Sequence, residues 1–569
     1  MTQPLVRRLL GVPRPAHRHR VEEEWIALSD GVRLATRLWL PADRSTPRAP
    51  AVLVRTPFGS RGGLEPTRLL AEALAGAGLA VVVQDVRGRF GSEGTLLPFE
   101  PEARDGEDAI RWIEAQPWYA GRLGLAGFSY AGFAALAAAA GAPDRVAALA
   151  TAGAAHDVCR ALRPGGAFAL ELGLRLAVAL EGQRSEPPRD LDRALAHRPL
   201  READRIALRE LPWFRAWIDR PPSHPDWRRL GPEVPKQIPT LALGGGFDPW
   251  LPAIVADHAA RAVGGESAST LVLGPWPHPR PLRFARADRA FLRVALREMV
   301  GFLAAALAGD PHGAGPCVRV LDGARELALD GFPPATATRR VLHLRSRGFA
   351  NRASGDGRLS EEGPSTGEPP DRFAYDPDDP APSVGGALLL GGGPADQRGV
   401  EERADVLCYT GDPLAAPLDV VGPVRVVLHA ASSAPDTDFT AKLVDVEPGG
   451  RAGFVCEGIV RARWRAGGAE PVWLAPDAPD ELCIDLGPAF HRFRAGHRLR
   501  LDVSSSSFPR FDRNPNTRGE PGRADAETSE VARQTLLHEA THPSRLELFV
   551  LEPGSENDTG PPNDVRRIP

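Results

Sequence analysis

The sequence has little cysteine, little lysine and no long apolar run. Five cysteines are scattered over 569 residues, an odd total with no CxxC pair. This spacing argues against a disulfide framework or a zinc site and favours reduced thiols. No stretch approaches the ~20 apolar residues of a membrane span, and the N-terminus lacks the apolar core of a secretory signal. We therefore expect a soluble, cytoplasmic protein that does not bind membranes.

Excess charge of either sign is also missing. The formal net charge is −4, which gives no reason to expect nucleic acid or an anionic membrane as a partner. The basic residues are almost all arginine, and Lys236 and Lys442 are the two lysines. We attribute this bias to genome composition. The apolar and charged fractions are those of a globular protein, and the length predicts two or three domains.

Strands and helices alternate between residues 21 and 155. A hairpin is expected to turn at Ser29-Asp30-Gly31. Continuous apolar runs at 49–57 and 79–88 are typical of strands that are buried on both faces. An amphipathic helix is expected over 102–118. This alternation predicts a parallel sheet with right-handed crossovers, the first part of an α/β domain.

The pattern then changes twice. Residues 156–235 carry helical runs and proline-rich breaks but no strand signal, which predicts a helical cap inserted into the α/β domain. Strands return in 236–312 and complete that domain. Short alternating runs separated by Gly and Pro fill 313–553, which predicts a β-sandwich or barrel. Residues 1–20 and 554–569 are expected to be tails, the second of them disordered.

The segment GLAGFSYAG (124–132) carries the clearest chemical signal. Ser129 stands between a buried strand and an alanine-rich helix, with Gly127 two residues before it and Gly132 three after it. A nucleophile elbow needs small residues around its tight turn, and the helix N-terminus favours developing negative charge. The spacing is G-x-S-x-x-G instead of the commoner G-x-S-x-G. An ordinary serine at a helix N-cap is the alternative interpretation.

A serine nucleophile needs a base, and the base needs an acid that orients it. In the α/β-hydrolase fold these follow the serine along the chain as acid and then histidine. Asp248 ends one predicted strand and His278 follows the next, so we predict that they form a catalytic triad with Ser129. Two other histidines compete. His258 lies in an amphipathic run and is expected on a helix surface, and His312 lies beyond the last predicted helix.

These residues resemble the cocaine esterase-like (CocE/NonD) serine hydrolases, relatives of X-prolyl dipeptidyl aminopeptidases and α-amino acid ester hydrolases. The resemblance covers nearly the whole chain and implies an α/β-hydrolase domain with an inserted helical cap, followed by an all-β jelly-roll (galactose-binding-like) domain. It also implies the same triad. The strings that carry it are VRTPFG (54–59), QDVRGRFGSEG (84–94), GFSYAG (127–132), GGFDPW (245–250), GPWPHP (274–279), YDPDDPAPSVGG (375–386), DTDFTAKLVDV (436–446) and SSSSFPRFDRNPNT (504–517).

The oxyanion hole is where this sequence departs from the family. The resemblance implies two donors: the backbone N–H after the nucleophile, here Tyr130, and a tyrosine hydroxyl from an R-x-P-Y segment. Phe58 occupies that tyrosine position, so only its backbone remains and the hydroxyl is missing. The loss of one such donor typically costs ~10²–10³ in rate. Three interpretations stay open: the Gly59 N–H or the Ser60 hydroxyl substitutes, the enzyme is slow, or the hydrolase is degenerate.

For the other residues in these family strings, we expect structural roles or a place near the substrate. Trp250 and Trp276 flank triad members, and a role in the substrate pocket is as well supported as a place in the core. The other charged and glycine positions are predicted to be structural, after the buried strand or at turns and at the interface of the β-domain with the hydrolase domain: Asp85, Arg87, Gly88, Asp436, Asp438, Asp512 and Arg513.

Three functions are compatible with these residues. The first is hydrolysis of a small-molecule acyl ester through an acyl-enzyme, with no metal or organic cofactor. The second is cleavage of an amide or short peptide, such as removal of X-Pro dipeptides, which needs carboxylates to bind a free ammonium; the cap offers Glu171, Glu181 and Glu186. The third is a binding protein with a vestigial hydrolase core. The oligomeric state is open, with a homodimer as one option.

Overall fold

A computed structural model describes residues 10, 15–42, 48–60, 66–182, 190–262, 269–278, 286–310, 317–323 and 325–551. The expected tail at 554–569 and His312 lie outside these residues. The chain divides into two compact units. Among the described residues, the first contains those up to Val158 and those in Pro225–Gly331, and the second contains those in Cys159–His224 and those from Phe332 to Leu551. No helix in the described ranges has both the length and the apolarity for a bilayer crossing.

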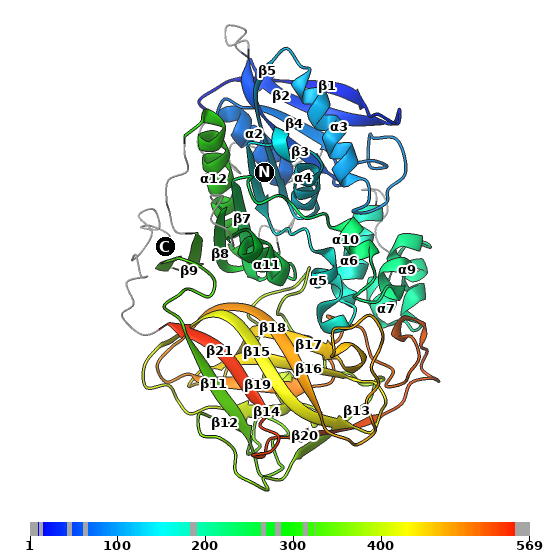
Figure 1. The fold of residues 1–569 in the computed structure, drawn as a ribbon, viewed down its shortest axis with the longest axis vertical. Helices are drawn as coiled ribbons and strands as arrows, with labels where there is room; N and C mark the ends of the chain where they lie inside the picture. The colour runs from blue at the N-terminus through cyan, green and yellow to red at the C-terminus, as the bar shows by residue number, and fades with distance from the viewer. Residues whose placement is uncertain are drawn as a thin grey trace. The chain divides into compact units, whose positions relative to one another are not determined.

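Within the described residues, the first unit contains a ten-stranded sheet in the order β1-β2-β4-β3-β5-β6-β7-β8-β9-β10 (Figure 1). Neighbours from β4 to β9 are parallel, and β1, β2 and β10 pair antiparallel at the edges. The predicted hairpin is confirmed, because Ala27 pairs with Arg33 across the turn. The strands are β1 (His19–Ala27), β2 (Arg33–Pro41), β3 (Ala49–Thr56), β4 (Ala80–Asp85), β5 (Tyr119–Phe128), β6 (Ala148–Ala152), β7 (Thr240–Phe247), β8 (Ser269–Pro277), β9 (Val318–Asp322) and β10 (Arg325–Leu329).

Helices cover both faces of this sheet. Alternate residues of β3 and β4 enter two separate cores: Val52 and Val81 pack with α2 and α12, whereas Leu53 and Val82 pack with α3 and α4. Burial on both faces explains why these strands read as continuous apolar runs. The helices of this unit are α2 (Pro66–Gly76), α3 (Glu102–Glu114), α4 (Tyr130–Gly141), α10 (Asp226–Leu230), α11 (Leu251–Ala262) and α12 (Arg286–Ala308).

The α/β sheet extends beyond the boundary expected at residue 312. The run 317–321, expected in the β-domain, contains most of β9, which pairs parallel with β8. Val318 and Val320 are buried, and Arg319 forms ion pairs with Glu298 of α12 at 2.8 Å and with Glu326 of β10 at 2.5 Å. A short alternating run of this kind has the same period in either sheet. Only the long-range pairing assigns it to the first one.

The second unit is built on a largely antiparallel sheet in the order β13-β20-β15-β21-β11-β12-β14-β19-β16-β17, with β18 paired to β15. This confirms the expected class, an α/β-hydrolase domain followed by a β-domain. The strands are β11 (Thr338–Arg345), β12 (Arg358–Ser360), β13 (Asp371–Tyr375), β14 (Leu407–Thr410), β15 (Leu418–Ser432), β16 (Asp438–Val446), β17 (Ala452–Arg461), β18 (Asp480–Phe493), β19 (Arg498–Ser504), β20 (Ala532–Leu537) and β21 (Arg545–Leu551).

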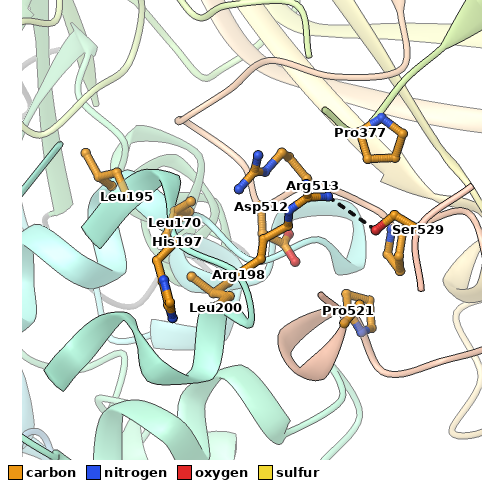
Figure 2. Close-up of a pocket in the computed structure, with 12 residues that line it drawn as sticks. Leu170, Leu195, His197, Arg198, Leu200, Pro377, Asp512, Arg513, Pro521 and Ser529 are labelled. Atoms are coloured by element: carbon orange, nitrogen blue, oxygen red, sulfur yellow. Dashed lines mark hydrogen bonds between the residues drawn. The ribbon is translucent and has the colours of Figure 1, made fainter. Parts of the chain in front are cut away.

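The inserted helices belong to the same compact unit as the β-domain. Loop residues of the β-domain bond them directly: the Asp512 carboxylate accepts the Phe168 N–H at 2.7 Å, and Arg513 donates to the Ala196 carbonyl at 2.7 Å. Figure 2 shows Arg198 reaching the Ser529 hydroxyl, at 3.3 Å, in a small pocket that both segments line. The inserted helices are α5 (Val158–Leu162), α6 (Leu170–Glu181), α7 (Leu191–Ala196), α8 (Ala203–Ala207) and α9 (Pro212–Asp219).

Candidate active site

Ser129 occupies a strained turn between β5 and α4. Its φ of 52° and ψ of −127° lie in a region that non-glycine residues rarely adopt, at a cost of ~1–3 kcal/mol. The flanking glycines allow this turn. A Cβ on Gly127 would lie 2.2 Å from the Ala131 backbone, and one on Gly132 would lie 2.6 Å from the Ala154 Cβ. The G-x-S-x-x-G spacing therefore meets the steric demand of a nucleophile elbow.

The side chain of Ser129 does not act as a helix cap. Within the described residues it makes no capping hydrogen bond, although Ser129 is the residue before α4. Its Oγ lies 2.9 Å from His278 Nε2 instead, and the residue is only partly buried. The N-cap alternative is therefore excluded, and the hydroxyl is paired with a base.

Asp248 and His278 complete a row of hydrogen bonds with this serine. Asp248 follows β7 and His278 follows β8, two neighbouring parallel strands whose carboxyl ends meet at one edge. The His278 Nδ1 lies 2.9 and 3.0 Å from the two Asp248 oxygens. Asp248 and His278 are 1% and 3% exposed, so little water screens their attraction. The backbone N–H of Trp250 also donates to Asp248 Oδ1 at 2.9 Å and fixes the carboxylate.

The competing histidine of α11 differs from its expected environment. His258 was expected on a helix surface but is 4% exposed, with Nδ1 3.1 Å from the Ser269 hydroxyl. Burial, aided by the charge of Arg261, lowers the pKa of His258 to about 4. The expectation is wrong because α11 packs its His258 face toward β8, and sequence periodicity alone does not show which polar residue falls on that face. His258 is a neutral core residue.

The expected oxyanion donors lie on two elements. Tyr130 is the first residue of α4, where backbone N–H groups have no partner within the helix. On the loop after β3, the Phe58 N–H donates to the Thr56 hydroxyl at 3.2 Å and the Ser60 N–H donates to Asp85. No acceptor among the described residues binds the Gly59 N–H. The backbone of Gly59 is thus better disposed to donate than the backbone of Phe58.

The two tryptophans beside the triad are both buried. Trp276, a residue of β8, lies in the core that includes α2 and α12, with its ring 5.3 Å from that of Phe291. Trp250 is 6% exposed and contributes the backbone donor to Asp248. That these rings line a substrate pocket stays a prediction.

Asp85, Arg87 and Gly88 have the structural roles that were expected of them. The Arg87 guanidinium binds Asp105 at 2.7 Å and Asp30 at 2.9 Å. A Cβ on Gly88, whose φ is +71°, would lie 2.3 Å from the Leu96 nitrogen. The Asp85 carboxylate holds the Ser60 N–H. These residues shape the loops around the site.

Sequence reasoning missed a second histidine–aspartate pair in this unit. His156 follows β6, and its Nδ1 lies 2.8 Å from Asp257 Oδ1 on α11. Burial is the largest single influence and disfavours the charged form, but the hydrogen bond to Asp257 and the negative charges of Asp257, Asp157 and Glu233 together outweigh it, so the pKa of His156 is raised. No serine hydroxyl bonds His156 in the described part of the chain, so the pair lacks a nucleophile.

Two family models match the chain in succession. Residues 30–280 match the model described as X-Pro dipeptidyl-peptidase (S15 family). Residues 315–547 match the model described as X-Pro dipeptidyl-peptidase C-terminal non-catalytic domain. The two matches cover most of the chain and correspond in order to the α/β domain and the β-domain.

Individual relatives are similar over almost their whole length. Cocaine esterase from Rhodococcus sp. (strain MB1 Bresler) is 34% identical, over 93% of this chain and 98% of that protein. An aminopeptidase from a marine sediment archaeon, Thaumarchaeota archaeon, superimposes with a TM-score of 0.79 at 26% identity, over 95% of this chain and 98% of that one. An α-amino acid ester hydrolase gives a TM-score of 0.78 at 25% identity, over 95% and 97% of the two chains.

Proposed function

The chain belongs to the X-Pro dipeptidyl-peptidase (S15) family, within its CocE/NonD serine hydrolases, and from this premise we propose that it cleaves acyl esters of small molecules. One observation carries the proposal. The Ser129 hydroxyl, the His278 imidazole and the Asp248 carboxylate form a single hydrogen-bonded row, with the serine at its partly exposed end. This is the arrangement that acyl transfer by a serine nucleophile requires.

The first half of the reaction forms an acyl-enzyme. Ser129 Oγ attacks the ester carbonyl carbon while His278 Nε2 takes the hydroxyl proton, and the Asp248 carboxylate stabilises the imidazolium that results. The carbonyl oxygen becomes an oxyanion, and we assign its donors to the N–H groups of Tyr130 and Gly59. His278 then gives its proton to the alkoxide oxygen as the C–O bond breaks, so the alcohol leaves.

The second half releases the acid. A water molecule attacks the acyl carbonyl, and His278 now accepts a proton from the water. The second tetrahedral intermediate collapses, Ser129 Oγ recovers the proton from His278, and the carboxylic acid leaves. Each step uses side chains and backbone groups of the first unit.

The inserted helices support an ester over an X-Pro peptide. The Glu171 carboxylate accepts the N–H groups of Leu389 and Leu390 at 2.9 and 3.1 Å and pairs with Arg175 at 2.7 Å. Glu181 pairs with Arg209 at 2.5 Å. These carboxylates are already engaged, so neither supports capture of a substrate ammonium. Glu186 lies outside the described residues. The relative with 34% identity is likewise named as an esterase.

A direct comparison of substrates tests the proposal. We expect the enzyme to hydrolyse p-nitrophenyl butyrate with a kcat/KM at least 100-fold above that for an Ala-Pro p-nitroanilide. A fluorophosphonate probe should label the wild-type enzyme and leave Ser129→Ala unlabelled. Preference for the anilide would replace the ester assignment by a peptidase one. Absence of both labelling and turnover would show that the hydrolase core is vestigial.

A further inference from the structure

A buried carboxylate stands behind the nucleophile elbow and has no part in the triad. Glu102 is the first residue of α3, and its side chain is 1% exposed. Glu102 Oε1 accepts the Tyr130 hydroxyl at 3.0 Å, and Oε2 pairs with the Arg55 guanidinium at 2.5 Å. The two carboxylate oxygens thus connect the residue after the nucleophile to a residue of β3.

The Tyr130 ring is held from two sides. Its hydroxyl donates to Glu102 and accepts the Phe99 N–H at 2.8 Å, and its ring stacks on that of Phe99 with the centroids 5.1 Å apart. Burial, together with the charge of Glu102, raises the pKa of Tyr130 well above its usual range. The hydroxyl is therefore protonated at neutral pH and donates to Glu102 there. A fixed side chain fixes the direction of the Tyr130 backbone N–H.

Arg55 is held just as firmly on the other side. Its Nε donates to Gln84 Oε1 at 2.9 Å, and one terminal nitrogen donates to the Glu102 carbonyl at 2.9 Å. Arg55 is the penultimate residue of strand β3, three residues before Phe58 in the loop that follows. The position of Arg55 therefore sets where that loop begins.

Stability alone does not account for this network. A buried ion pair loses several kcal/mol of hydration, and well-packed apolar residues of the same volume are often no less stabilising. The two helices involved are already locked by close packing, because a Cβ on Gly106 of α3 would lie 2.4 Å from the Ala138 Cβ of α4. A buried carboxylate that adds little stability but connects Tyr130 to Arg55 is suited to hold these two residues in position.

We infer that Glu102 is a positioning residue that holds both halves of the oxyanion hole, through Tyr130 on one side and Arg55 on the other. The inference rests on the proposed function, since the two N–H groups matter only if an oxyanion forms between them. Donors aligned in advance stabilise the transition state more than the bound substrate. Loss of the alignment should therefore lower kcat and leave KM unchanged.

Two substitutions disturb the network at different points. Tyr130→Phe removes the hydroxyl that donates to Glu102 and keeps the ring. Glu102→Gln replaces the carboxylate by a neutral amide, so it weakens the bond from Tyr130 and the ion pair with Arg55 together. Tyr375→Phe is the matched control, because Tyr375 is a fully buried tyrosine of the β-domain whose hydroxyl donates to the Asn514 carbonyl at 3.2 Å. It loses a buried hydroxyl in the other unit.

We expect Tyr130→Phe and Glu102→Gln each to lower kcat on p-nitrophenyl butyrate about 5–30-fold, with KM within twofold of wild type. The second-order rate of fluorophosphonate labelling should fall in parallel, since that reaction also places negative oxygen in the hole. Tyr375→Phe should keep wild-type kcat and labelling rate. The double variant should lose less than the product of the two single losses, because both act through one carboxylate.

Several outcomes would overturn the inference while the proposed function stands. These are a wild-type kcat and labelling rate in Tyr130→Phe, a rise in KM at constant kcat, an equal loss in Tyr375→Phe, or fully multiplicative losses in the double variant. Thermal unfolding of each variant shows whether it is folded, and Tyr130→Phe decides the matter if Glu102→Gln is not. A wild-type enzyme that neither turns over the ester nor reacts with the probe instead overturns the proposed function.

Discussion

Each unit contains a cluster of serine, histidine and aspartate within the described residues, and the hydrogen bonds in the two clusters are arranged differently. In the first unit the bonds run in a row, from Ser129 through the two ring nitrogens of His278 to the carboxylate. In the β-domain, Ser346 Oγ donates to Asp371 Oδ2 at 2.7 Å, and His538 Nε2 lies 3.0 Å from both the hydroxyl and the same carboxylate oxygen. The serine and the histidine there both bond the same carboxylate oxygen.

We propose that this difference separates a nucleophilic serine, Ser129, from a structural one, Ser346. Ser346 has its proton held by a carboxylate, and no imidazole stands between the two to carry charge away. Tyr409 donates to the same oxygen at 2.7 Å, and Asp371 and His538 are both 0% exposed. Ser129 instead lies on a strained turn and is partly exposed. Residue types alone would allow either cluster to be a triad. The order in which the residues are hydrogen-bonded and the exposure of the serine distinguish the two clusters.

Matched serine substitutions give the largest expected difference between the two clusters. Ser129→Ala should lower kcat/KM for p-nitrophenyl butyrate by at least ~10⁴-fold, because removal of the nucleophile leaves only binding and the oxyanion hole. Ser346→Ala should stay within twofold of wild type. Steady-state kinetics on both variants checks this. A comparable loss in Ser346→Ala would contradict the structural assignment of the second cluster.

With matched aspartate substitutions, we expect the larger loss of stability in the β-domain cluster and the larger loss of activity in the Ser129 cluster. Asp371→Asn leaves buried donors around it poorly paired and should lower the free energy of unfolding of the β-domain by about 3 kcal/mol. Asp248→Asn should change stability little and lower kcat by about 10⁴-fold, because the imidazole loses its orienting partner. Thermal unfolding and kcat, measured together on both variants, test this exchange of roles. Equal thermal shifts for the two would count against it.

A third buried histidine, His258, predicts how the stability of the first unit depends on pH. The pKa of His258 is lowered to about 4 by burial, whereas an unfolded histidine titrates near 6.5. The unfolded state therefore binds more protons below pH 6.5, and stability present above that pH is lost as the pH falls toward 4. The expected loss is about 3 kcal/mol at most.

His258→Gln removes this titrating group, whereas the carboxylates titrate alike in the variant and in wild type. The difference in melting temperature between pH 7 and pH 4.5 should therefore be smaller in the variant than in wild type. A difference of the same size in both would mean that His258 is not the group responsible.

The smallest expected effect concerns the oxyanion hole that we propose beside Ser129. Phe58→Tyr adds the hydroxyl that the family pattern supplies, and it should change kcat less than about twofold, because we assign that donor position to the Gly59 N–H. Measurement of kcat on p-nitrophenyl butyrate, with KM determined alongside, checks this. A rise in kcat of about tenfold or more would contradict the assignment of Gly59.

Local patterns in the sequence were enough to predict much of this protein. Alternation of apolar runs predicted the α/β sheet, and small residues around Ser129 predicted the elbow. The order of Asp248 and His278 after strand ends predicted that His278 would come within hydrogen-bonding distance of Ser129 and Asp248 within that distance of His278, because parallel strands end at one edge. Their catalytic roles remain a proposal.

Other features were decided only by tertiary structure. Periodicity did not show that β9 pairs with β8, that His258 faces the core, or that the inserted helices group with the β-domain. Nor did it indicate that Glu102 would bridge Tyr130 and Arg55. A sequence pattern reports which face of one element is apolar. The partner of each polar group on that face is set by contacts between residues far apart in the chain, and these exist only once the elements have packed.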